Sequence, residues 1–512
     1  MIQIKTALLS TYYKDGLNIV AEALDQFGVG MISTGGTLKF LQDAGFDARP
    51  VEDLTQFPEM LGGRVKTLHP KVLGGILNRR NMAEDQSQLL EFDIPSIDLV
   101  VVNLYPFDET VLAGGSHEDI IEKIDIGGVS LIRAAAKNYQ DVVILADPSD
   151  YRFLANELLE NNGFISLKTR KHLAAKAFQI TAAYDAAISQ YLVSLEEESS
   201  DMPEKWIAVA GPGAPLRYGE NPHQKASFYG NLKDVFQKIH GKELSYNNLV
   251  DAGACCDLLA EFGSEKPATV IVKHTNACGV AVSETLHESY SRALACDPLS
   301  AFGGVIGMNK PVDAETAALV QDLFFEILVA PDFSPEALEI LSSKKNRILL
   351  RLKDYKKTEW QVKSLFNGLL VQQSDSKIAE PLECKVVTSK SPSDSDWRNL
   401  MFANKIVKHT KSNTIVLAKD GILLASGTGQ TSRVDALKQA IQKAIGFDLS
   451  LEGAAMASDA FFPFPDCVEI AAEAGISSVI QPGGSIKDAD SVEACNRLGL
   501  SMVTTGLRHF KH

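Results

Sequence analysis

The chain has 512 residues, which is too long for one ordinary hydrophobic core and predicts two or more domains. Apolar residues make up 45% and charged residues 22%, as in globular proteins, so extensive disorder is excluded. A net charge of −15 without a basic stripe argues against nucleic acid as a partner. Seven cysteines without a CxxC pair favour reduced core thiols over a disulfide framework or a zinc site.

The first residues show no basic start followed by a long apolar run, and the chain has no stretch of about 18 uninterrupted apolar residues. The sequence therefore predicts a cytoplasmic protein with no membrane partner.

The first region alternates apolar strand patterns with helical patterns, which is typical of an α/β fold. One run, IDLVVVNLY, is apolar nearly throughout, as expected for a central parallel strand covered on both faces. A parallel sheet is predicted, with strands at residues 4–9, 28–33, 97–105 and 142–146.

Two polar segments divide the rest of the chain. Residues 195–205 are acidic and contain serine and proline, which predicts a linker and a domain boundary near residue 200. Residues 389–397 (SKSPSDSDW) split the remainder near residue 390. The pentapeptide IVKHT occurs in both halves, at 271–275 and 406–410, which suggests an internal duplication. The alternative is that Ile-Val before a polar turn is simply a common strand ending.

A glycine loop follows the second predicted strand. Its sequence, STGGT, precedes apolar residues at helical spacing, which predicts a strand, a loop and a helix start. The unpaired N–H groups of a helix start favour anions, so a phosphate could bind there. A tight turn without a ligand is the alternative.

Three further motifs of the first region carry polar side chains beside glycines or strand ends. The segment GGRVKTLHP at 62–70 can hold an oxyanion, and Asp125 opens a helix that runs to Lys137. Tyr105 closes the central strand, where ligands of open parallel sheets bind. A phenol and an ammonium group there, oriented by a carboxylate, could relay protons.

In order and spacing, STGGT, GGRVKTLHP, NLYPF and DIGGVSLIRAAAKN resemble the cyclohydrolase domain of the bifunctional formyltransferase–IMP cyclohydrolase family of purine synthesis. The resemblance implies a methylglyoxal-synthase-like parallel α/β domain over residues 1–200, with its core at about 1–147. One departure is Tyr12, because the family's SVSDKTG reads STYYKDG here. The implied reaction centre is Lys66, Tyr105, Asp125 and Lys137, and the implied nucleotide-binding residues are Ser10, Lys14, Ser33, Thr34, Gly35, Gly36, Thr37, Arg64, Thr67 and Asn103.

The second region carries its own ordered motifs, which resemble the formyltransferase half of the same family. Taken singly, the motif RYGENPHQ is typical of a surface loop, and the aromatic and proline-rich motif SDAFFPFPD is typical of a rigid core corner. Such an aromatic wall could also stack a flat heterocycle such as a pterin. The motifs are RYGENPHQ (217–224), VKHTNACG (272–279), SAFGG (300–304), KSN (411–413), SDAFFPFPD (458–466) and LRHF (507–510).

By this resemblance, residues 201–512 form two cytidine-deaminase-like α/β units, and a homodimer builds the formyltransferase sites across its interface. The implied cosubstrate is 10-formyltetrahydrofolate. Zinc deaminases need an HxE or CxE segment together with a PCxxC, and no PCxxC occurs in this sequence, so no zinc is expected. Arg217, Tyr218 and Arg508 would bind the ribonucleotide, Lys273, His274 and Asn413 would act at the reacting atoms, and Phe461 and Asp466 would line the folate side.

The resemblance therefore predicts a bifunctional enzyme acting on small-molecule nucleotide and folate substrates. It would transfer a formyl group from the folate to 5-aminoimidazole-4-carboxamide ribonucleotide (AICAR), and then close the product to inosine monophosphate (IMP) with loss of water. Two alternatives belong to other classes: a nucleotide-sensing first domain, and a zinc hydrolase in the carboxyl half. Tyr105 and Lys66 argue against the first alternative, and the missing ligands argue against the second.

Overall fold

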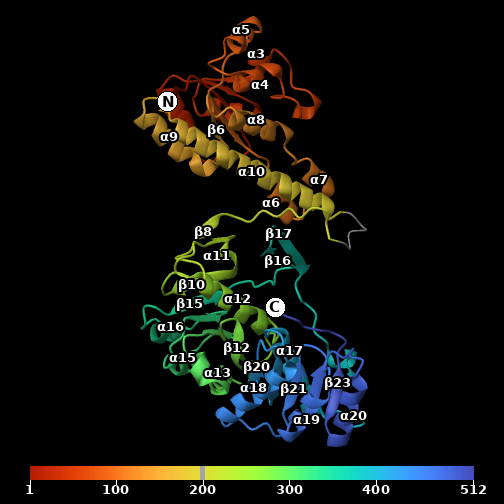
Figure 1. Ribbon diagram of the computed structural model, residues 1–512. Coiled ribbons are helices and arrows are strands. Elements are labelled where there is room, and N and C mark those ends of the chain that lie inside the picture. The colour runs from red at the N-terminus through yellow and green to blue at the C-terminus, as the bar shows by residue number, and fades with distance from the viewer. Residues whose placement is uncertain (196–201) are drawn as a thin grey trace. The chain divides into compact units, whose positions relative to one another are not determined.

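The computed structural model describes residues 1–195 and 202–512, and it divides the chain into two compact units (Figure 1). Unit 1 is Met1–Val209 and unit 2 is Ala210–His512. The predicted linker at 195–205 lies mostly outside the described residues. Within the described residues, no helix combines the length and the apolar character needed to cross a membrane.

Unit 1 is built on a five-stranded sheet in which all strands are parallel, in the order β4-β3-β2-β5-β6. The predicted parallel α/β architecture is thus confirmed, and all four predicted strands are present; the short β4 was not predicted. The strands are β2 (Thr6–Thr11), β3 (Gly30–Ser33), β4 (Ala48–Pro50), β5 (Leu99–Asn103) and β6 (Val143–Leu145).

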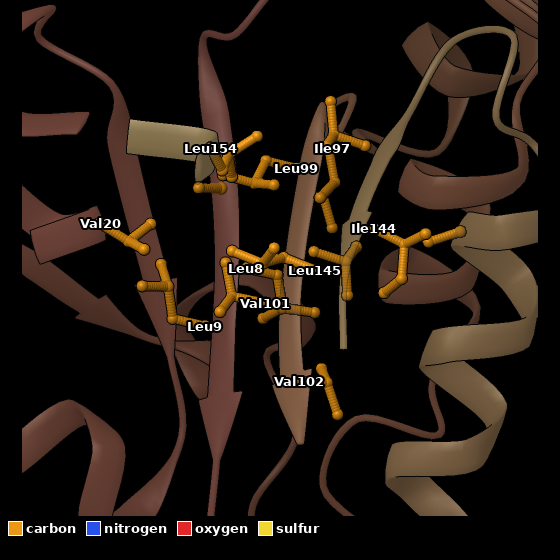
Figure 2. Packing of buried hydrophobic residues seen from close by; sticks show 14 of the residues in the cluster. Leu8, Leu9, Val20, Ile97, Leu99, Val101, Val102, Ile144, Leu145 and Leu154 are labelled. Carbon is orange, nitrogen blue, oxygen red and sulfur yellow. The ribbon is translucent and has the colours of Figure 1, made fainter. Parts of the chain in front are cut away.

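The core of unit 1 lies on both faces of β2 and β5, as Figure 2 shows for Leu8, Leu9, Leu99 and Val101. Every residue of β5 is buried, which explains why its sequence is a continuous apolar run. The main helices are α1 (Leu17–Gln26), α2 (Gly35–Asp43), α4 (Pro70–Leu77), α5 (Ala83–Glu91), α8 (Ile126–Lys137), α9 (Tyr151–Glu160) and α10 (Leu167–Val193); shorter ones are α3 (Val51–Thr55), α6 (Phe107–Leu112) and α7 (His117–Ile121).

Unit 2 is built on a twelve-stranded sheet in the order β10-β15-β14-β13-β11-β12-β20-β19-β21-β22-β23-β18. The order of the second six strands is that of the first six reversed, and the halves meet where β12 pairs antiparallel with β20. The strands of the first half are β10 (Phe236–His240), β11 (Ala268–Lys273), β12 (Asn276–Val282), β13 (Val305–Met308), β14 (Ile327–Ala330) and β15 (Ile348–Leu352); those of the second are β18 (Lys385–Val386), β19 (Ile415–Lys419), β20 (Ile422–Gly427), β21 (Ala455–Ser458), β22 (Ser478–Gln481) and β23 (Ser501–Thr504).

Local details repeat between the halves as well. The hairpins β11–β12 and β19–β20 each have a two-residue turn, at 274–275 and 420–421, and each has a bulge at the same distance before it. A 15-residue helix with a capping box precedes each hairpin, α12 (Tyr246–Ala260) and α17 (Asp394–Lys408). Unit 2 is therefore internally duplicated about an approximate two-fold axis between β12 and β20.

The two IVKHT copies do not occupy equivalent places in this duplication. The first ends strand β11, whereas the second ends helix α17. Unit 2 is duplicated, as the repeated pentapeptide suggested. The two copies are nevertheless not equivalent positions of the duplication, because the same five residues adopt two different structures. The strand-ending alternative also fails for the second copy.

Further elements of unit 2 complete the fold. An additional hairpin, β16 (Trp360–Leu365) and β17 (Gly368–Gln373), makes no extensive contact with another helix or strand among the described residues, and it stands apart in Figure 1. The remaining helices and strands include β8 (Gly213–Pro215), β9 (Ser227–Tyr229), α11 (Leu232–Val235), α13 (Leu286–Cys296), α14 (Pro298–Ala301), α15 (Ala314–Val320), α16 (Pro335–Leu341), α18 (Arg433–Gly446), α19 (Asp466–Glu473) and α20 (Asp488–Leu498).

Candidate active sites

Unit 1 has a cavity of about 600 Å³ beyond the carboxyl ends of β2, β3 and β5. This is the edge at which open parallel sheets bind ligands, because the loops that follow the strands diverge there. The predicted site residues that line it are Ser10, Lys14, Thr34, Gly35, Gly36, Thr37, Arg64, Lys66, Thr67, Asn103, Tyr105 and Asp125.

One wall of this cavity is suited to an anion. Helix α2 begins after Thr34, whose side chain makes no capping hydrogen bond. The Lys66 ammonium lies 3.4 Å from where a Cβ on Gly35 would be, and the Lys14 ammonium lies 3.8 Å from the same point on Gly36. Burial lowers the pKa of Lys14. Two ammonium groups at a helix amino terminus can hold a phosphate group.

Hydroxyl groups fix the loops of this wall. The Ser10 and Thr34 hydroxyl oxygens are 2.9 Å apart, and the backbone N–H of Thr11 donates to Thr37 Oγ1 at 3.0 Å. Ser33 is different, because it is fully buried and donates to the carbonyl oxygen of Leu9 at 2.7 Å. The structure thus places Ser33 beneath the cavity, where it joins β2 to β3.

The same cavity is lined by the titratable groups Tyr105 and Asp125. Burial raises the pKa of Tyr105, and the nearby Asp125 carboxylate raises it further. Burial also raises the pKa of Asp125, although backbone N–H groups, that of Gly128 foremost, partly stabilise its charge. Asp125 caps helix α8 through a 2.6 Å hydrogen bond from the Gly128 N–H. A phenol and a carboxyl with raised pKa values in one cavity are suited to moving protons.

Arg64 and Lys66 already have acidic partners. Lys66 Nζ lies 2.7 Å from a carboxylate oxygen of Glu59, and Arg64 forms an ion pair with Glu122. A bound phosphate would compete with these carboxylates for the two cations. Motif reasoning missed both partners, because neither carboxylate lies in a motif that the sequence singled out.

Asn103 holds the cavity loop in place. Its Oδ1 accepts hydrogen bonds from the N–H groups of Tyr12 (2.6 Å) and Tyr13 (3.0 Å), and its Nδ2 donates to the Tyr13 carbonyl oxygen (3.0 Å). The loop thereby presents Tyr12 to the cavity, with its ring centroid 5.5 Å from that of Tyr105. Tyr12 was noted only as a departure from the family pattern, and the structure makes it part of the cavity wall.

Lys137 is not brought together with the other three members of the predicted reaction centre. Asp125 precedes the first turn of α8 and Lys137 ends it, twelve residues later, which corresponds to about 18 Å along a helix. Lys137 is exposed and lines a separate cavity of about 580 Å³ between α8 and α10, together with Arg133 and Phe178. Its catalytic role stays a prediction.

In unit 2, strand register brings Lys273, His274 and Asn413 to one end of the sheet. Ala281 of β12 pairs with Ile422 of β20, so the turn of the β11–β12 hairpin lies at the carboxyl end of β20. The start of β19 lies at this end too, because Ile415 pairs with Gly427. Side chains 140 residues apart in sequence therefore share one sheet end.

The hairpin turn holds Lys273 and His274 in a defined geometry. His274 and Thr275 have φ angles of 50° and 64°, as a two-residue hairpin turn requires. Asp251 of helix α12 accepts a 2.8 Å hydrogen bond from the Thr275 N–H. Lys273 Nζ donates to the carbonyl oxygen of Phe302 at 2.8 Å, which joins the VKHT and SAFGG motifs.

Asn413 is anchored to the loop that follows β20. Its Nδ2 donates to the carbonyl oxygens of Gln430 (3.0 Å) and Thr431 (3.3 Å). Because both amide hydrogens are engaged, the atom left available to a substrate is Oδ1.

The carboxyl-terminal segment lies beside this loop. Arg433 pairs with the fully buried Asp459 at 3.2 Å, and its guanidinium lies 5.9 Å from the Phe510 ring. The exposed Arg508 stacks on the same ring at 4.4 Å.

Of the predicted folate-side residues, Asp466 begins α19 and Phe461 lies in the loop before it. Phe461 is 37% exposed. Arg217 stacks on the neighbouring Tyr218 at 5.4 Å. Among residues 202–512, no hydrogen bond, ion pair or ring contact joins Arg217 or Tyr218 to Lys273, His274 or Asn413. The ribonucleotide-binding role of Arg217 and Tyr218 stays a prediction.

Comparison with known proteins assigns a family to each region of the chain. The family described as AICARFT/IMPCHase bienzyme matches residues 135–443, and the MGS-like domain family matches residues 16–130. The methylglyoxal-synthase-like character predicted for the first domain is thereby confirmed. The tandem cytidine-deaminase-like units stay a prediction, supported by the duplicated topology.

Several relatives match over their full length. A "Bifunctional purine biosynthesis protein PurH" from Bacteroides thetaiotaomicron is 52% identical over 510 residues, covering 100% of this chain and 99% of that protein. Proteins of the same name from Thermoanaerobacter sp. and Acetivibrio thermocellus are each 47% identical, covering 99% of this chain and 100% of their own length. The chain therefore belongs to the AICARFT/IMPCHase bienzyme family, and it carries AICAR formyltransferase and IMP cyclohydrolase activities.

Proposed function

We propose that the two activities are divided between the two units, cyclisation in unit 1 and formyl transfer in unit 2. The match of residues 16–130 to MGS-like domains supports this division, as does the unit 1 cavity, which Lys14 and Lys66 line together with Tyr105 and Asp125.

In unit 1, Lys14 and Lys66 hold the nucleotide phosphate at the start of α2. Ring closure joins a carboxamide nitrogen to a formyl carbon of the same molecule, so the substrate itself meets most of the entropy cost of approach. Tyr105, kept protonated by its raised pKa, donates a proton to the departing water, and Asp125 accepts one from the attacking nitrogen.

In unit 2, the AICAR amine attacks the formyl carbon of the folate. His274 accepts the proton that leaves the amine, since histidine is the side chain that most often serves as a general base. Lys273 stabilises the oxygen that becomes negative and supplies a proton to the folate nitrogen. The Asn413 Nδ2 donates to the carbonyl oxygens of Gln430 and Thr431, so the role left to this side chain is to accept a hydrogen bond from the attacking amine through Oδ1.

The variant His274→Ala tests the transfer assignment. We expect the formyl-transfer rate to fall roughly 10² to 10⁴-fold, the range for general acid–base groups, while cyclisation of the formylated nucleotide is unchanged. The matched control is His287→Ala, because His287 lies in the first turn of α13, at the opposite end of the sheet. A normal transfer rate in folded His274→Ala would end the assignment, and a parallel loss of both activities would indicate a structural role.

We also propose a homodimer that completes the transfer site. A lone two-stranded hairpin is marginal in water, yet β16–β17 exposes Val362 (51%), Phe366 (97%), Leu369 (56%) and Leu370 (56%). A second copy that covers this hairpin would also supply the Arg217 and Tyr218 that one chain leaves unconnected to Lys273. Sedimentation of the wild type and of Phe366→Ser tests this; a wild type that is monomeric and active excludes it.

The cosubstrate is a folate, as the formyltransferase activity implies, and we propose that it is 10-formyltetrahydrofolate. Phe461 and Asp466 would contact its pterin ring. We also propose that the enzyme needs no zinc and acts in the cytoplasm. The described residues include no group of three or more His, Cys, Asp or Glu side chains placed to hold a metal ion.

A further inference from the structure

A buried ion cluster lies where the two halves of unit 2 meet. One carboxylate oxygen of Glu261 accepts hydrogen bonds from Lys408 Nζ at 2.9 Å and from His409 Nε2 at 2.8 Å. The side chains of Lys408 and His409 are 2% and 7% exposed, and that of Glu261 is 15% exposed. Burial alone would raise the pKa of Glu261, but His409 and Lys408 hold it at about 2, so the carboxylate stays ionised.

The cluster lies on the approximate two-fold axis. Glu261 is the C-cap of α12 and His409 is the C-cap of α17, and these two helices are equivalent in the duplication. The ion cluster therefore joins the matching ends of matching helices. Lys408 and His409 belong to the second IVKHT copy, to which neither proposed activity assigns a role.

Each helix leads to one part of the proposed transfer site. In α12, the Asp251 carboxylate accepts a hydrogen bond from the Thr275 N–H. This bond fixes the hairpin turn beside Lys273 and His274. On the α17 side, the chain runs in four residues from His409 to Asn413.

The carboxyl-terminal segment is tied to the same place. Lys511 Nζ donates to the carbonyl oxygen of His409 at 3.1 Å. The Ser412 N–H donates to the Lys511 carbonyl oxygen, and the Lys511 N–H donates to Ser412 Oγ, each at 3.0 Å. Arg508 precedes Lys511 by three residues, so it is anchored through this pairing.

A buried ion pair is a poor source of stability, because the cost of removing charges from water offsets their attraction. Its geometry is nevertheless strict, since a displaced partner would leave a buried charge unpaired. We infer that Glu261 and Lys408 are positioning residues for formyl transfer, fixing the Lys273–His274 turn relative to Asn413 and Arg508. This inference rests on the proposed roles of His274 and Asn413 in transfer.

Full-length Glu261→Gln tests the inference through the separate values of kcat and KM. A misplacement of reacting groups by about 1 Å can cost roughly 100-fold in rate, so we expect transfer kcat to fall at least tenfold, with a smaller change in KM and with cyclisation unchanged. Glu261→Asp keeps the charge and should restore part of kcat. Asp332→Asn is the control, because it breaks the 2.7 Å ion pair with Arg351 at the opposite end of the sheet.

A purely structural role makes a different prediction. Glu261→Gln would then melt at a lower temperature but show the wild-type transfer kcat well below that temperature, and this result would overturn the inference. Should Glu261→Gln not fold, the double variant Glu261→Leu with Lys408→Met replaces the charges by apolar side chains, which proteins often tolerate. We expect it to fold with low transfer kcat; a wild-type kcat overturns the inference.

The variants His274→Ala and Asn413→Ala separate a failure of the proposed transfer site from a failure of the positioning role. If His274→Ala and Asn413→Ala both keep normal transfer, the site assignment is wrong whatever Glu261 does. If those two variants lose transfer while Glu261→Gln keeps it, only the positioning role is wrong.

Discussion

Replacing Asn103 by alanine separates two roles for a residue that the sequence predicts to bind the substrate. Its side chain makes four hydrogen bonds, to the N–H groups of Tyr12 and Tyr13, the carbonyl oxygen of Tyr13 and the hydroxyl of Tyr151. Asn103 itself is 5% exposed. The structure therefore indicates that Asn103 holds the cavity loop in place, in addition to any contact that it makes with the ligand.

The expected loss of stability follows from these bonds. Each contributes about 0.5 to 1.5 kcal/mol net, and because water can replace part of them in a half-buried loop, we expect a loss of about 2 to 3 kcal/mol. For a domain of this size, each kcal/mol lowers the melting temperature by roughly 2 to 4 °C, so Asn103→Ala should lower that of unit 1 by about 4 to 12 °C.

Calorimetry and a cyclisation assay on full-length protein measure both effects. The matched control is Asn78→Ala, because the Asn78 side chain is equally buried and bonds to the Gly74 and Gly75 carbonyl oxygens, away from the cavity. Both variants should be less stable, and only Asn103→Ala should cyclise slowly at a temperature where it is folded. An unchanged melting temperature with impaired cyclisation would refute the reasoning and return Asn103 to a purely ligand-binding role.

Four further predictions concern local geometry, pH, separability and metal content. In Gly128→Ala the new Cβ would lie 2.3 Å from Asp125 Oδ2, so the carboxylate must leave its cap; cyclisation should fall while transfer, assayed in parallel, is unchanged. Since the pKa of Glu261 is lowered to about 2 from 4.5, its stabilising effect is complete above about pH 4.5 and is lost as pH falls towards 2; acid unfolding of unit 2 should be less pH-dependent in Glu261→Gln. A fragment of residues 1–209 should fold by circular dichroism and cyclise the formylated nucleotide, and a folded but inactive fragment would contradict the division of activities. Elemental analysis should find substoichiometric zinc in active protein, and one tightly bound zinc per chain would contradict the proposal for unit 2.

The alternation of strand, glycine loop and helix in unit 1 was predictable because it is encoded locally. The fully buried run of β5 and the helix start after Thr34 are read from hydrophobic period and turn residues, and the structure has both. For parallel sheets, the rule that ligands bind beyond the carboxyl ends of strands then located Tyr105 and the glycine loop at one cavity.

Contacts between distant segments were decided by strand order and register, which no local pattern contains. Ser33 lies in a predicted binding motif but is fully buried and donates to the backbone of β2, and Lys137 follows Asp125 in one motif but ends the helix that Asp125 caps. The sequence offered no reason to expect that Glu261 would meet His409, because the contact exists only where α12 and α17 converge at the two-fold axis.

Sequence by itself determined the family, the parallel sheet of unit 1 and the residue types of both sites, because these depend on motifs and periodicity within short segments. The tertiary structure alone decided that Lys273 and Asn413 share one sheet end, that Tyr12 lines the cavity, and that the two IVKHT copies adopt different structures. The physical reason is that a side chain's partners across a sheet follow from non-local pairing, in which identical residues take the conformation that their surroundings stabilise.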